Sequence, residues 1–483
     1  MATAYKTPGV YIEEISKFPP SIAEVETAVP AFIGYTQKAD NLTANDLHLV
    51  PTRITSLLEF ENYFGLPQPE QKITVTLNVT QTAAGAVTGQ TAVASMAEAD
   101  RSKHILHYAL QLYFANGGGP AYIVSIGLYK PNFGDPLMLS DFELGKDTLT
   151  TEPEPTLIVF PEAQNLANIG DFNSLHNDAL AQCAHLQNRF VIMDVHGGDA
   201  NQFSLSNPKT NLLAAVKNYR DHGIGMDNLL YGAAYAPNLE TVLKFVFDDS
   251  KTSVVIITNG AAAAPVELST LKTTQNQVYT AATAAIAAMP NILPPSAAMA
   301  GIYAAVDNSR GVWKAPANVG VNAVIQPTIQ VSNDDHGLIN VDSTAGKSVN
   351  VIRAFIGKGT LVWGARTLAG NDNEWRYISV RRFFIFAEQS IKNATEQFVF
   401  EPNDANTWVK LQGMIENFLT TLWRQGALQG IKPEQAFYVA VGLGKTMSAL
   451  DIVEGRLIIE IGMAVVHPAE FIILRFSQMM AQS

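Results

Sequence analysis

Short apolar segments alternate with helix-like segments through the middle of this 483-residue chain. Each apolar segment is only long enough for a buried strand, and apolar residues at helical spacing fill 174–187 and 209–220 between them. Strands that alternate with helices are typical of a layered α/β sheet. The predicted strands are TLIVF (156–160), RFVIMDV (189–195), NLLYGAAY (228–235) and SVVIIT (253–258).

The flanking regions add further elements of both kinds. A Thr-rich stretch at 72–98 predicts a surface β-hairpin with turn points at Gly85 and Gly89. Ser56 is placed to cap a helix over 54–64, with Glu59 three residues on. The fold class is therefore α+β / α/β and multidomain. Further predicted helices are 104–115, 266–288, 376–397 and 407–424, and further strands are 31–36, 121–126, 437–443 and 455–466.

The two chain ends each carry a strand-like segment without a neighbouring partner. Near the start, residues 7–15 alternate with a period of two, and near the end 470–476 is almost entirely apolar. An unpaired strand must join a distant part of its own chain or another chain. The predicted exchange residues are Val10, Tyr11, Ile12 and Glu13 at the start, and Phe471, Ile472, Ile473 and Leu474 at the end.

Composition excludes several classes of partner. The formal charge of −12 argues against nucleic acid, because phosphate binding needs clustered Lys and Arg. The acidic residues lie mainly before residue 345, and the remainder is nearly neutral, which indicates two bodies with different neighbours. Cys183 is the only cysteine, so an intrachain disulfide is impossible. No signal peptide and no membrane-spanning apolar run is visible.

Short motifs give weak evidence for chemistry. Gly444-Lys445-Thr446 looks like the end of a phosphate-binding loop, but Val439 stands where that motif needs glycine, so a turn is the better interpretation. Gly117–Gly119 follows a predicted helix and reads as its stop. The alternative to a structural protein is an α/β enzyme with its site at the strand end Asp194–His196. No metal or hydrolase motif accompanies that pair, so the sequence predicts no catalytic, cofactor or metal residue.

Long stretches of the chain resemble the tail sheath proteins of contractile phages and phage-like contractile injection systems. The resemblance spans most of the sequence and is carried by several motifs together. The segments 66–100 and 244–265 match the pattern less clearly. The matching segments include TPGVYIEE (7–14), LQLYFANGGGPAYIVSI (110–126), PPSAAMAGIYAAVDNSRGVWKAPAN (294–318) and nearly everything from 350 onward.

The resemblance implies a structural role. Sheath subunits form hexameric rings stacked as a helical sheath around an inner tube, and contraction drives that tube through a target envelope. The implied partners are further copies of the chain, the inner tube protein, and baseplate and tail terminator proteins, with no nucleic acid and no membrane insertion. The family has no catalytic residues and no cofactor. Assembly is expected in the bacterial cytoplasm, as part of a phage tail or a particle released outside the cell.

The resemblance also implies a division of the chain. The C-terminal region, a mixed sheet plus helices completed by the N-terminal strand, is expected to form the inner sheath domain, with a central α/β domain inserted and facing outward. Arg381, Arg382 and Lys392 are the tube-facing candidates. The expected parts are an N-terminal arm (1–30), the start of the sheath core (31–65), a β-hairpin insertion (66–100), the central domain (101–345) and the inner domain (346–483).

Overall fold

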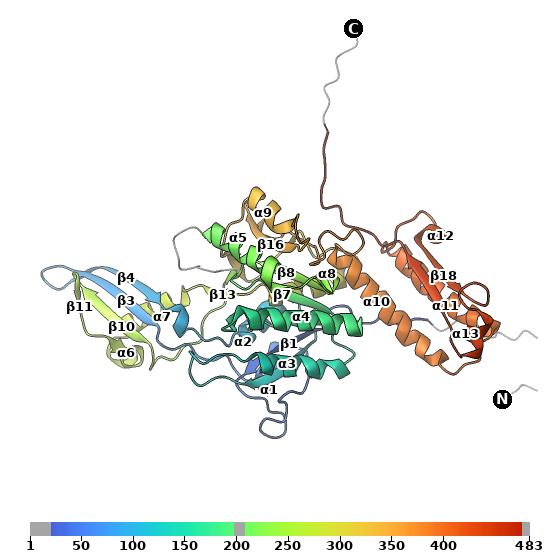
Figure 1. Cartoon of the computed structure of the whole chain (residues 1–483). Helices are drawn as coiled ribbons and strands as arrows, with labels where there is room; N and C mark the ends of the chain where they lie inside the picture. The colour runs from blue at the N-terminus through green and yellow to red at the C-terminus, as the bar shows by residue number, and fades with distance from the viewer. Residues whose placement is uncertain (1–20, 198–207, 476–483) are drawn as a thin grey trace, which may run out of the picture. The chain divides into compact units, whose positions relative to one another are not determined.

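The computed structural model describes residues 21–197 and 208–475. The chain divides into two compact units, which we call the main unit and the C-terminal unit. The main unit contains Glu26–Phe386 and His467–Ser483, and the C-terminal unit contains Met1–Val25 and Ala387–Val466. Figure 1 shows the elements of both, coloured along the chain. The chain therefore enters the C-terminal unit within a helix and returns to the main unit just before its end.

A nine-stranded sheet organises the main unit, in the order β14-β17-β16-β8-β7-β6-β1-β5-β2. The six strands from β16 to β5 run parallel to their neighbours, while β14, β17 and β2 pair antiparallel at the two edges. Their bounds are β1 (Pro30–Thr36), β2 (Thr52–Ile54), β5 (Ala121–Leu128), β6 (Leu157–Val159), β7 (Phe190–Asp194), β8 (Gly232–Ala236), β14 (Val319–Gly320), β16 (Val349–Phe355) and β17 (Gly359–Val362). All seven residues of β1 are buried, as expected for a central parallel strand.

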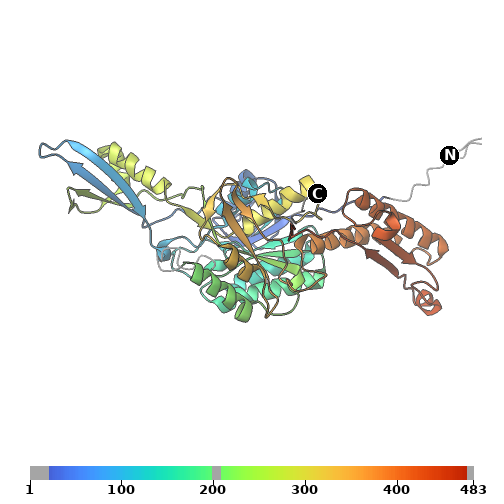
Figure 2. The same ribbon diagram turned by 90° about the horizontal axis from the view of Figure 1, so that it is seen from above.

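Helices cover both faces of this sheet, which Figure 2 shows from above. Successive side chains of β1 point to opposite faces. Phe32 packs against Tyr113 of α2 with ring centroids 5.1 Å apart, whereas Tyr35 packs against Phe142 of α3 at 5.8 Å. The helices of the main unit are α1 (Leu57–Phe64), α2 (Leu106–Ala115), α3 (Leu139–Thr148), α4 (Ile169–Leu186), α5 (Pro208–Asn218), α6 (Leu268–Thr274), α7 (Asn276–Ala287), α8 (Ser296–Arg310) and α9 (Asn333–Asn340).

The helices α2 and α8 approach each other closely because glycine stands at their crossing. A Cβ on Gly301 of α8 would lie 2.4 Å from the backbone oxygen of Tyr113, far inside normal contact. Gly117 follows α2 with φ of 89°, and a Cβ there would meet the Ala305 side chain at 2.9 Å. Both positions therefore require glycine for contact, and Gly117 also for its left-handed backbone.

A second sheet has its own small core. It joins β3 (Thr74–Gln81) and β4 (Val87–Ser95), the predicted hairpin, to β10 (Ser253–Thr258), with the short β11 (Ala261–Ala262) and β12 (Val266–Glu267) paired to β10. The helices α6 and α7 cover its apolar face, where Val75, Leu77 and Val254 are fully buried. Two segments far apart in sequence, 66–100 and 244–265, thus meet in one sheet.

Smaller elements complete the main unit. A three-stranded sheet consists of β13 (Asn291–Leu293), β9 (Leu239–Thr241) and β15 (Val324–Pro327). One π-helical turn, η4 (Tyr219–Gly223), continues α5. The 3-10 turns are η1 (Glu98–Asp100), η2 (Leu149–Thr151), η3 (Ala163–Asn165), η5 (Leu229–Tyr231) and, in the C-terminal unit, η6 (Glu396–Phe398).

The C-terminal unit packs helices against a two-stranded sheet. The amphipathic α11 (Ala405–Arg424) begins at Asp404, whose side chain accepts from the backbone N–H groups of Asn406 and Thr407, and it buries an apolar stripe that includes Leu411, Ile415 and Leu419. The sheet is β18 (Phe437–Val441) paired antiparallel with β19 (Ile459–Met463). The other helices are α10 (Ile378–Thr395), which begins in the main unit, α12 (Pro433–Ala436) and α13 (Ala449–Val453).

Several sequence predictions can be compared directly with these elements. The mixed α+β class is confirmed, and Ser56 caps α1 as predicted, accepting from the backbone of Glu59. The predicted start of a separate body at 346 differs from the structure, because β16 pairs in parallel with β8 and so extends the large sheet. The boundary between the two compact units lies later in the sequence, at Ala387 within α10.

Candidate assembly site

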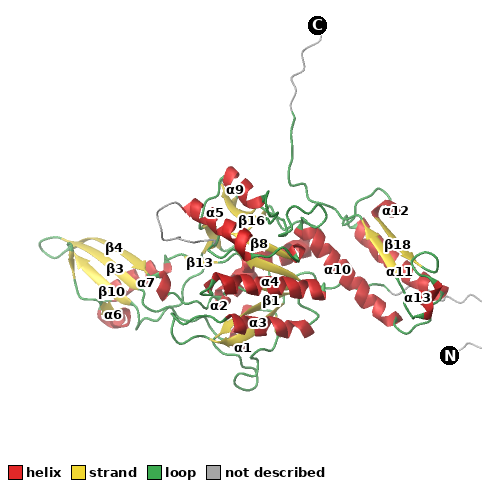
Figure 3. Ribbon diagram, viewed as in Figure 1, coloured by secondary structure: helices red, strands yellow, loops and turns green. Residues whose placement is uncertain are grey.

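The C-terminal arm, which we define as residues 467–475, presents a run of apolar side chains to solvent. Phe471, Ile472, Ile473 and Leu474 are between 69% and 80% exposed. The arm forms no helix and no strand with the other described residues, and Figure 3 draws it as loop. Four neighbouring large apolar side chains are unfavourable in water and favour a partner that covers them.

Glu470 fastens the base of this arm to the main unit. Its carboxylate accepts from Arg366 Nη2 at 2.8 Å and Nε at 3.0 Å, from Asn340 Nδ2 at 2.8 Å, and from the Tyr377 hydroxyl at 3.1 Å. Burial raises the pKa of Glu470, but the hydrogen bonds from Arg366 and Asn340 outweigh it and lower that pKa below its usual value. The ionised carboxylate is thus held by four donors just before the exposed run.

The β18–β19 sheet has open edges. Five residue pairs join the two strands, and neither outer edge is paired with another strand among residues 21–197 and 208–475. Open edges of a sheet carry unpaired backbone N–H and C=O groups and are templates for another strand. The C-terminal unit therefore offers hydrogen-bonding edges, while the C-terminal arm offers a segment of strand-like sequence.

The predicted N-terminal exchange residues, Val10–Glu13, lie outside the described residues. The segment that follows them is fixed by side chains from distant elements. Val25 N–H donates to Ser390 Oγ at 3.2 Å, and Val29 N–H donates to Thr156 Oγ1 at 2.9 Å. The N-terminal segment is therefore held at its base, as the C-terminal arm is.

The structure places the three tube-facing candidates in different surroundings. Arg382 is 3% exposed and forms an ion pair with Asp307 at 2.5 Å, while also donating to the backbone oxygen of Thr27. Arg381 is 4% exposed, and its guanidinium lies 4.9 Å from the ring centroid of Trp375. Lys392, near the end of α10, is exposed. The structure thus joins Arg382 to the base of the N-terminal segment, a contact that sequence reasoning missed.

The alternative enzyme site, Asp194–His196, serves a structural contact. Asp194 ends β7 and is fully buried by its neighbours; it accepts from Ser296 N–H at 2.8 Å and from Ser296 Oγ at 2.6 Å. Burial raises the pKa of Asp194 to about 7, although both hydrogen bonds lower it. Ser296 begins α8, so the Asp194 side chain caps that helix from another element. The ring of His196 packs edge-on against Phe172, with centroids 5.3 Å apart.

Glu162, which follows the neighbouring strand β6, also accepts hydrogen bonds from the first residue of a helix. Its two carboxylate oxygens accept from Tyr35 N–H at 2.9 Å and from Leu106 N–H at 3.2 Å. Leu106 begins α2, which lacks a side-chain cap of its own. Burial raises the pKa of Glu162 to about 8 against the effect of these bonds. The position between β1 and β6 is thus filled by a side chain of this chain.

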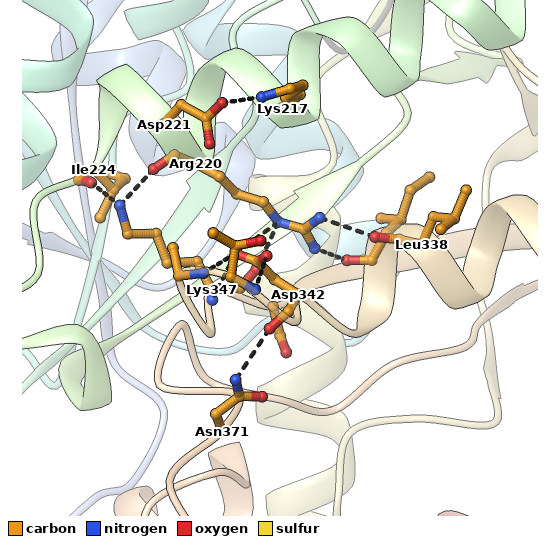
Figure 4. A network of polar contacts seen from close by, with 12 residues as sticks. Lys217, Arg220, Asp221, Ile224, Leu338, Asp342, Lys347 and Asn371 are labelled. Carbon is orange, nitrogen blue, oxygen red and sulfur yellow. Dashed lines mark hydrogen bonds and ion pairs between the residues drawn. The ribbon is translucent and has the colours of Figure 1, made fainter.

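A third polar cluster joins η4, which follows α5, to α9 and to the segment just before β16, as Figure 4 shows. Lys347 is 4% exposed, and its ammonium donates to the backbone oxygens of Arg220 and Ile224. Arg220 donates in turn to the backbone oxygens of Lys347, Leu338 and Ile339. Carbonyl oxygens thus bind both cations, Arg220 also forms an ion pair with Asp342 at 3.9 Å, and the cluster ties segments of the main unit together.

The remaining motifs are structural. Residues 442–447 form the turn after β18, and Gly117–Gly119 stop α2, both as predicted. Within the part of the chain that the structure describes, no group of three or more His, Cys, Asp or Glu side chains is placed to hold a metal ion. No helix among those residues has the length and apolar character to cross a membrane.

Sequence reasoning missed the residues that hold the chain ends. Glu470 is the single charge between the apolar segments 461–466 and 471–474, which is the signal that points to a fixed position. Its partners Arg366 and Tyr377 are distant in sequence, and no local pattern connects them to it.

Comparisons with known proteins bear on this arrangement. The model of the phage tail sheath protein central domain matches residues 205–368, and that of the phage tail sheath C-terminal domain matches 370–478. The chain is similar to a subunit in the anti-feeding prophage (AFP) baseplate, six-fold symmetrised, with 32% identity over 99% of this chain and 100% of that one and a TM-score of 0.63. A search of curated proteins found no match.

Two contracted assemblies are also similar. The AFP helical sheath in its contracted state has 31% identity over 98% of this chain and 100% of that one, with a TM-score of 0.63. The sheath complex of PVC, an extracellular contractile injection system, also contracted, has 28% identity over 99% of each chain and a TM-score of 0.61. The chain belongs to the phage tail sheath family. It is a contractile tail sheath subunit, a structural component of a phage tail-like particle.

Proposed function

We propose that this subunit polymerises as stacked hexameric rings around an inner tube, and that contraction of the resulting sheath drives the tube through a target envelope. The observation that carries the proposal is the anchored C-terminal arm, whose apolar residues Phe471–Leu474 are exposed, in a chain that also has open edges on β18–β19. Similarity to two contracted sheaths supports the contractile part.

Strand addition links one subunit to the next. The arm of one copy adds to the β18–β19 sheet of a second copy, where its backbone groups replace water as hydrogen-bond partners. Alternate side chains then face opposite sides, so Phe471 and Ile473 share one side and Ile472 and Leu474 share the other. The N-terminal residues Val10–Glu13 add in the same manner to a third copy.

We also propose which regions of the chain form the arm, the inner part and the outward-facing part of the sheath. Residues 1–30 serve as the N-terminal arm, the C-terminal unit from Ala387 to Val466 as the inner sheath region, and the second sheet, which contains the hairpin insertion 66–100, as part of the outward-facing region. Lys392, which is exposed, is the tube-facing candidate that needs no rearrangement. Arg381 and Arg382 are buried in this chain, so they act on the tube by positioning α10.

The partners follow from this arrangement. The subunit binds further copies of itself and an inner tube protein, and baseplate and tail terminator proteins bound the sheath at its ends. Similarity to a subunit of the AFP baseplate structure supports baseplate association. We propose assembly in the bacterial cytoplasm and, as in the extracellular system of the PVC comparison, release of the complete particle.

Electron microscopy tests the proposal. The chain is expressed alone and together with its tube protein, and each preparation is purified without denaturant. Long hollow striated cylinders from the full chain, and discrete particles from a chain ending at residue 470, are the expected result. Full-length cylinders from the truncated chain would contradict strand addition by the C-terminal arm.

A ligand screen examines the enzyme alternative. The Asp194–His196 strand end predicts a ligand-dependent rise in melting temperature, because a ligand that binds the folded state stabilises it. We expect no such rise for the wild-type chain. A ligand that raises the melting temperature of wild type but not of His196→Ala would favour the alternative.

A further inference from the structure

The C-terminal arm follows β19 so closely in sequence that it could form a hairpin with β19 of the same chain. Residues 464–466 continue β19, with hydrogen bonds from Ala464 N–H to Ala436 O and from Val466 N–H to Ala427 O. Four residues, 467–470, then separate this segment from Phe471. Connections of two to five residues are usual in β-hairpins. An antiparallel hairpin of 459–466 with 471–475 is therefore within reach of the chain.

Such a hairpin would prevent strand addition between subunits. It would cover the free edge of β19 and bury the apolar residues of the arm within one molecule. The arm and the edge would then both be unavailable to other copies. Exchange of an identical element between copies always competes with this closed form, because the same contacts are made in both. In the structure the hairpin is not formed, since 471–475 pair with no described strand.

The loop that would close the hairpin is bound by side chains of the main unit. Glu470, its last residue, is bound by Arg366, Asn340 and Tyr377, which all belong to the main unit. Within 468–475, no other side chain forms a hydrogen bond or ion pair with a described residue. The ring of His467 adds an edge-on contact to Tyr377, with centroids 6.1 Å apart.

We propose that the Arg366–Glu470 contact is a positioning device that prevents the C-terminal arm from closing on β19 of its own chain and so reserves both for a second copy. The two oxygens of Glu470 match the fork of the Arg366 guanidinium, a geometry that fixes direction as well as position. This inference rests on the proposed strand addition and names the residues that direct it between copies.

Three variants test the device in the full chain. Glu470→Ala removes the anchor, and Glu470→Gln keeps the shape but loses the charge. Glu374→Gln is the matched control, because it makes the same change at an exposed carboxylate of the main unit whose side chain has no hydrogen bond to a described residue. Each variant is compared with wild type in two measurements: the protein concentration needed for cylinders to form, and amide hydrogen exchange of the unassembled subunit.

We expect the concentration needed for assembly to rise at least tenfold for Glu470→Ala and by a smaller factor for Glu470→Gln. Backbone amides of 459–463 and 471–475 should exchange at least tenfold more slowly in unassembled Glu470→Ala than in wild type. A residue that merely stabilises the fold would not slow exchange at β19. Should Glu470→Ala fail to fold, since it leaves buried Arg366 unpaired, Glu470→Gln decides by the same criteria.

The outcomes separate this inference from the proposed function. If Glu470 variants assemble at the concentration of Glu374→Gln, or if their exchange at 459–463 equals that of wild type, the positioning role is refuted and strand addition stands. If wild type forms no cylinders with or without the tube protein, the proposed function fails. Hydrogen exchange then still decides whether the Arg366–Glu470 contact prevents hairpin closure.

Discussion

Replacing one apolar residue of the C-terminal arm should weaken assembly without weakening the subunit. Ile473 is 77% exposed in the isolated chain, so Ile473→Ser removes apolar surface that only a partner can bury. Full burial of a large aliphatic side chain contributes roughly 1.5–3 kcal/mol. At about 1.4 kcal/mol per tenfold, the concentration needed for cylinder formation should rise about 10- to 100-fold. Ile472→Ser, on the opposite side of the added strand, should show which side meets the receiving sheet.

The measurement is sedimentation of cylinders over a dilution series, with electron microscopy of the pellet. Ile356→Ser is the matched control, because Ile356 is fully exposed in the turn between β16 and β17 of the main unit. The free energy of unfolding of the unassembled subunit should change by less than about 0.5 kcal/mol for all three variants. Wild-type assembly by both Ile472→Ser and Ile473→Ser would refute the claim that the arm is buried in the sheath.

Three further predictions concern the main unit. Asp307→Asn leaves Arg382 buried without its charge partner and should lower the free energy of unfolding by about 3–5 kcal/mol in urea titration; a loss below about 1 kcal/mol would contradict the ion pair. Gly301→Val should lower the melting temperature markedly, whereas Gly134→Ala, where a Cβ meets nothing within 4 Å, should not. Burial raises the pKa of Glu162 from 4.5 to about 8, so the folded state keeps a proton that the unfolded chain releases. Stability from this group should therefore fall as pH rises from about 4.5 to 8, and Glu162→Gln should flatten that slope; an unchanged slope would refute the shift.

Local patterns were sufficient for most elements of the fold. The Thr-rich stretch became β3 and β4, and the apolar stripe that includes Leu411, Ile415 and Leu419 became the buried side of α11. These predictions succeed because side-chain period and capping depend on neighbours in sequence. The resemblance to tail sheath proteins, carried by motifs over most of the chain, is confirmed by the family models.

Pairing between distant segments could not be predicted in the same way. The parallel register of β10 with β3 brings Val254 beside Val75, although the two residues are far apart in sequence. Likewise β16 joins β8, although the change in charge near residue 345 indicated a new body. Period-two alternation shows which side of a strand is apolar, but many strands share that property, so it does not select the partner.

Buried polar residues were the hardest to interpret from sequence. Arg382 is a tube-facing candidate through the resemblance to sheath proteins, and in the structure it pairs with Asp307 inside the main unit. Glu470 and Arg366 are held together by tertiary structure alone. A buried charged residue can pair with any opposite charge, and a cation also with any carbonyl oxygen, that folding brings near. Its partner therefore depends on the tertiary structure and cannot be predicted from local sequence.

The two buried carboxylates at the strand ends explain how an α/β sheet of this kind serves a structural role. In the sheet order, the chain passes from β1 to β5 on one side and then returns to β6 on the other, so the switch point lies between β1 and β6. Open α/β sheets bind ligands at this point, often with an anion at the N-terminus of the following helix. Here the Glu162 carboxylate bonds Tyr35 of β1 and the first N–H of α2.

Asp194 repeats this arrangement at the next strand, where it bonds the first residue of α8. Both carboxyl groups thus occupy positions that an anionic ligand takes in binding proteins of this architecture, and both fix helices that pack on each other through Gly301. An internal side chain holds these helices permanently, whereas a bound ligand would hold them only while present. If the arms pass displacement to other copies, as proposed, the main unit has to be rigid, because a main unit that deforms would absorb that displacement.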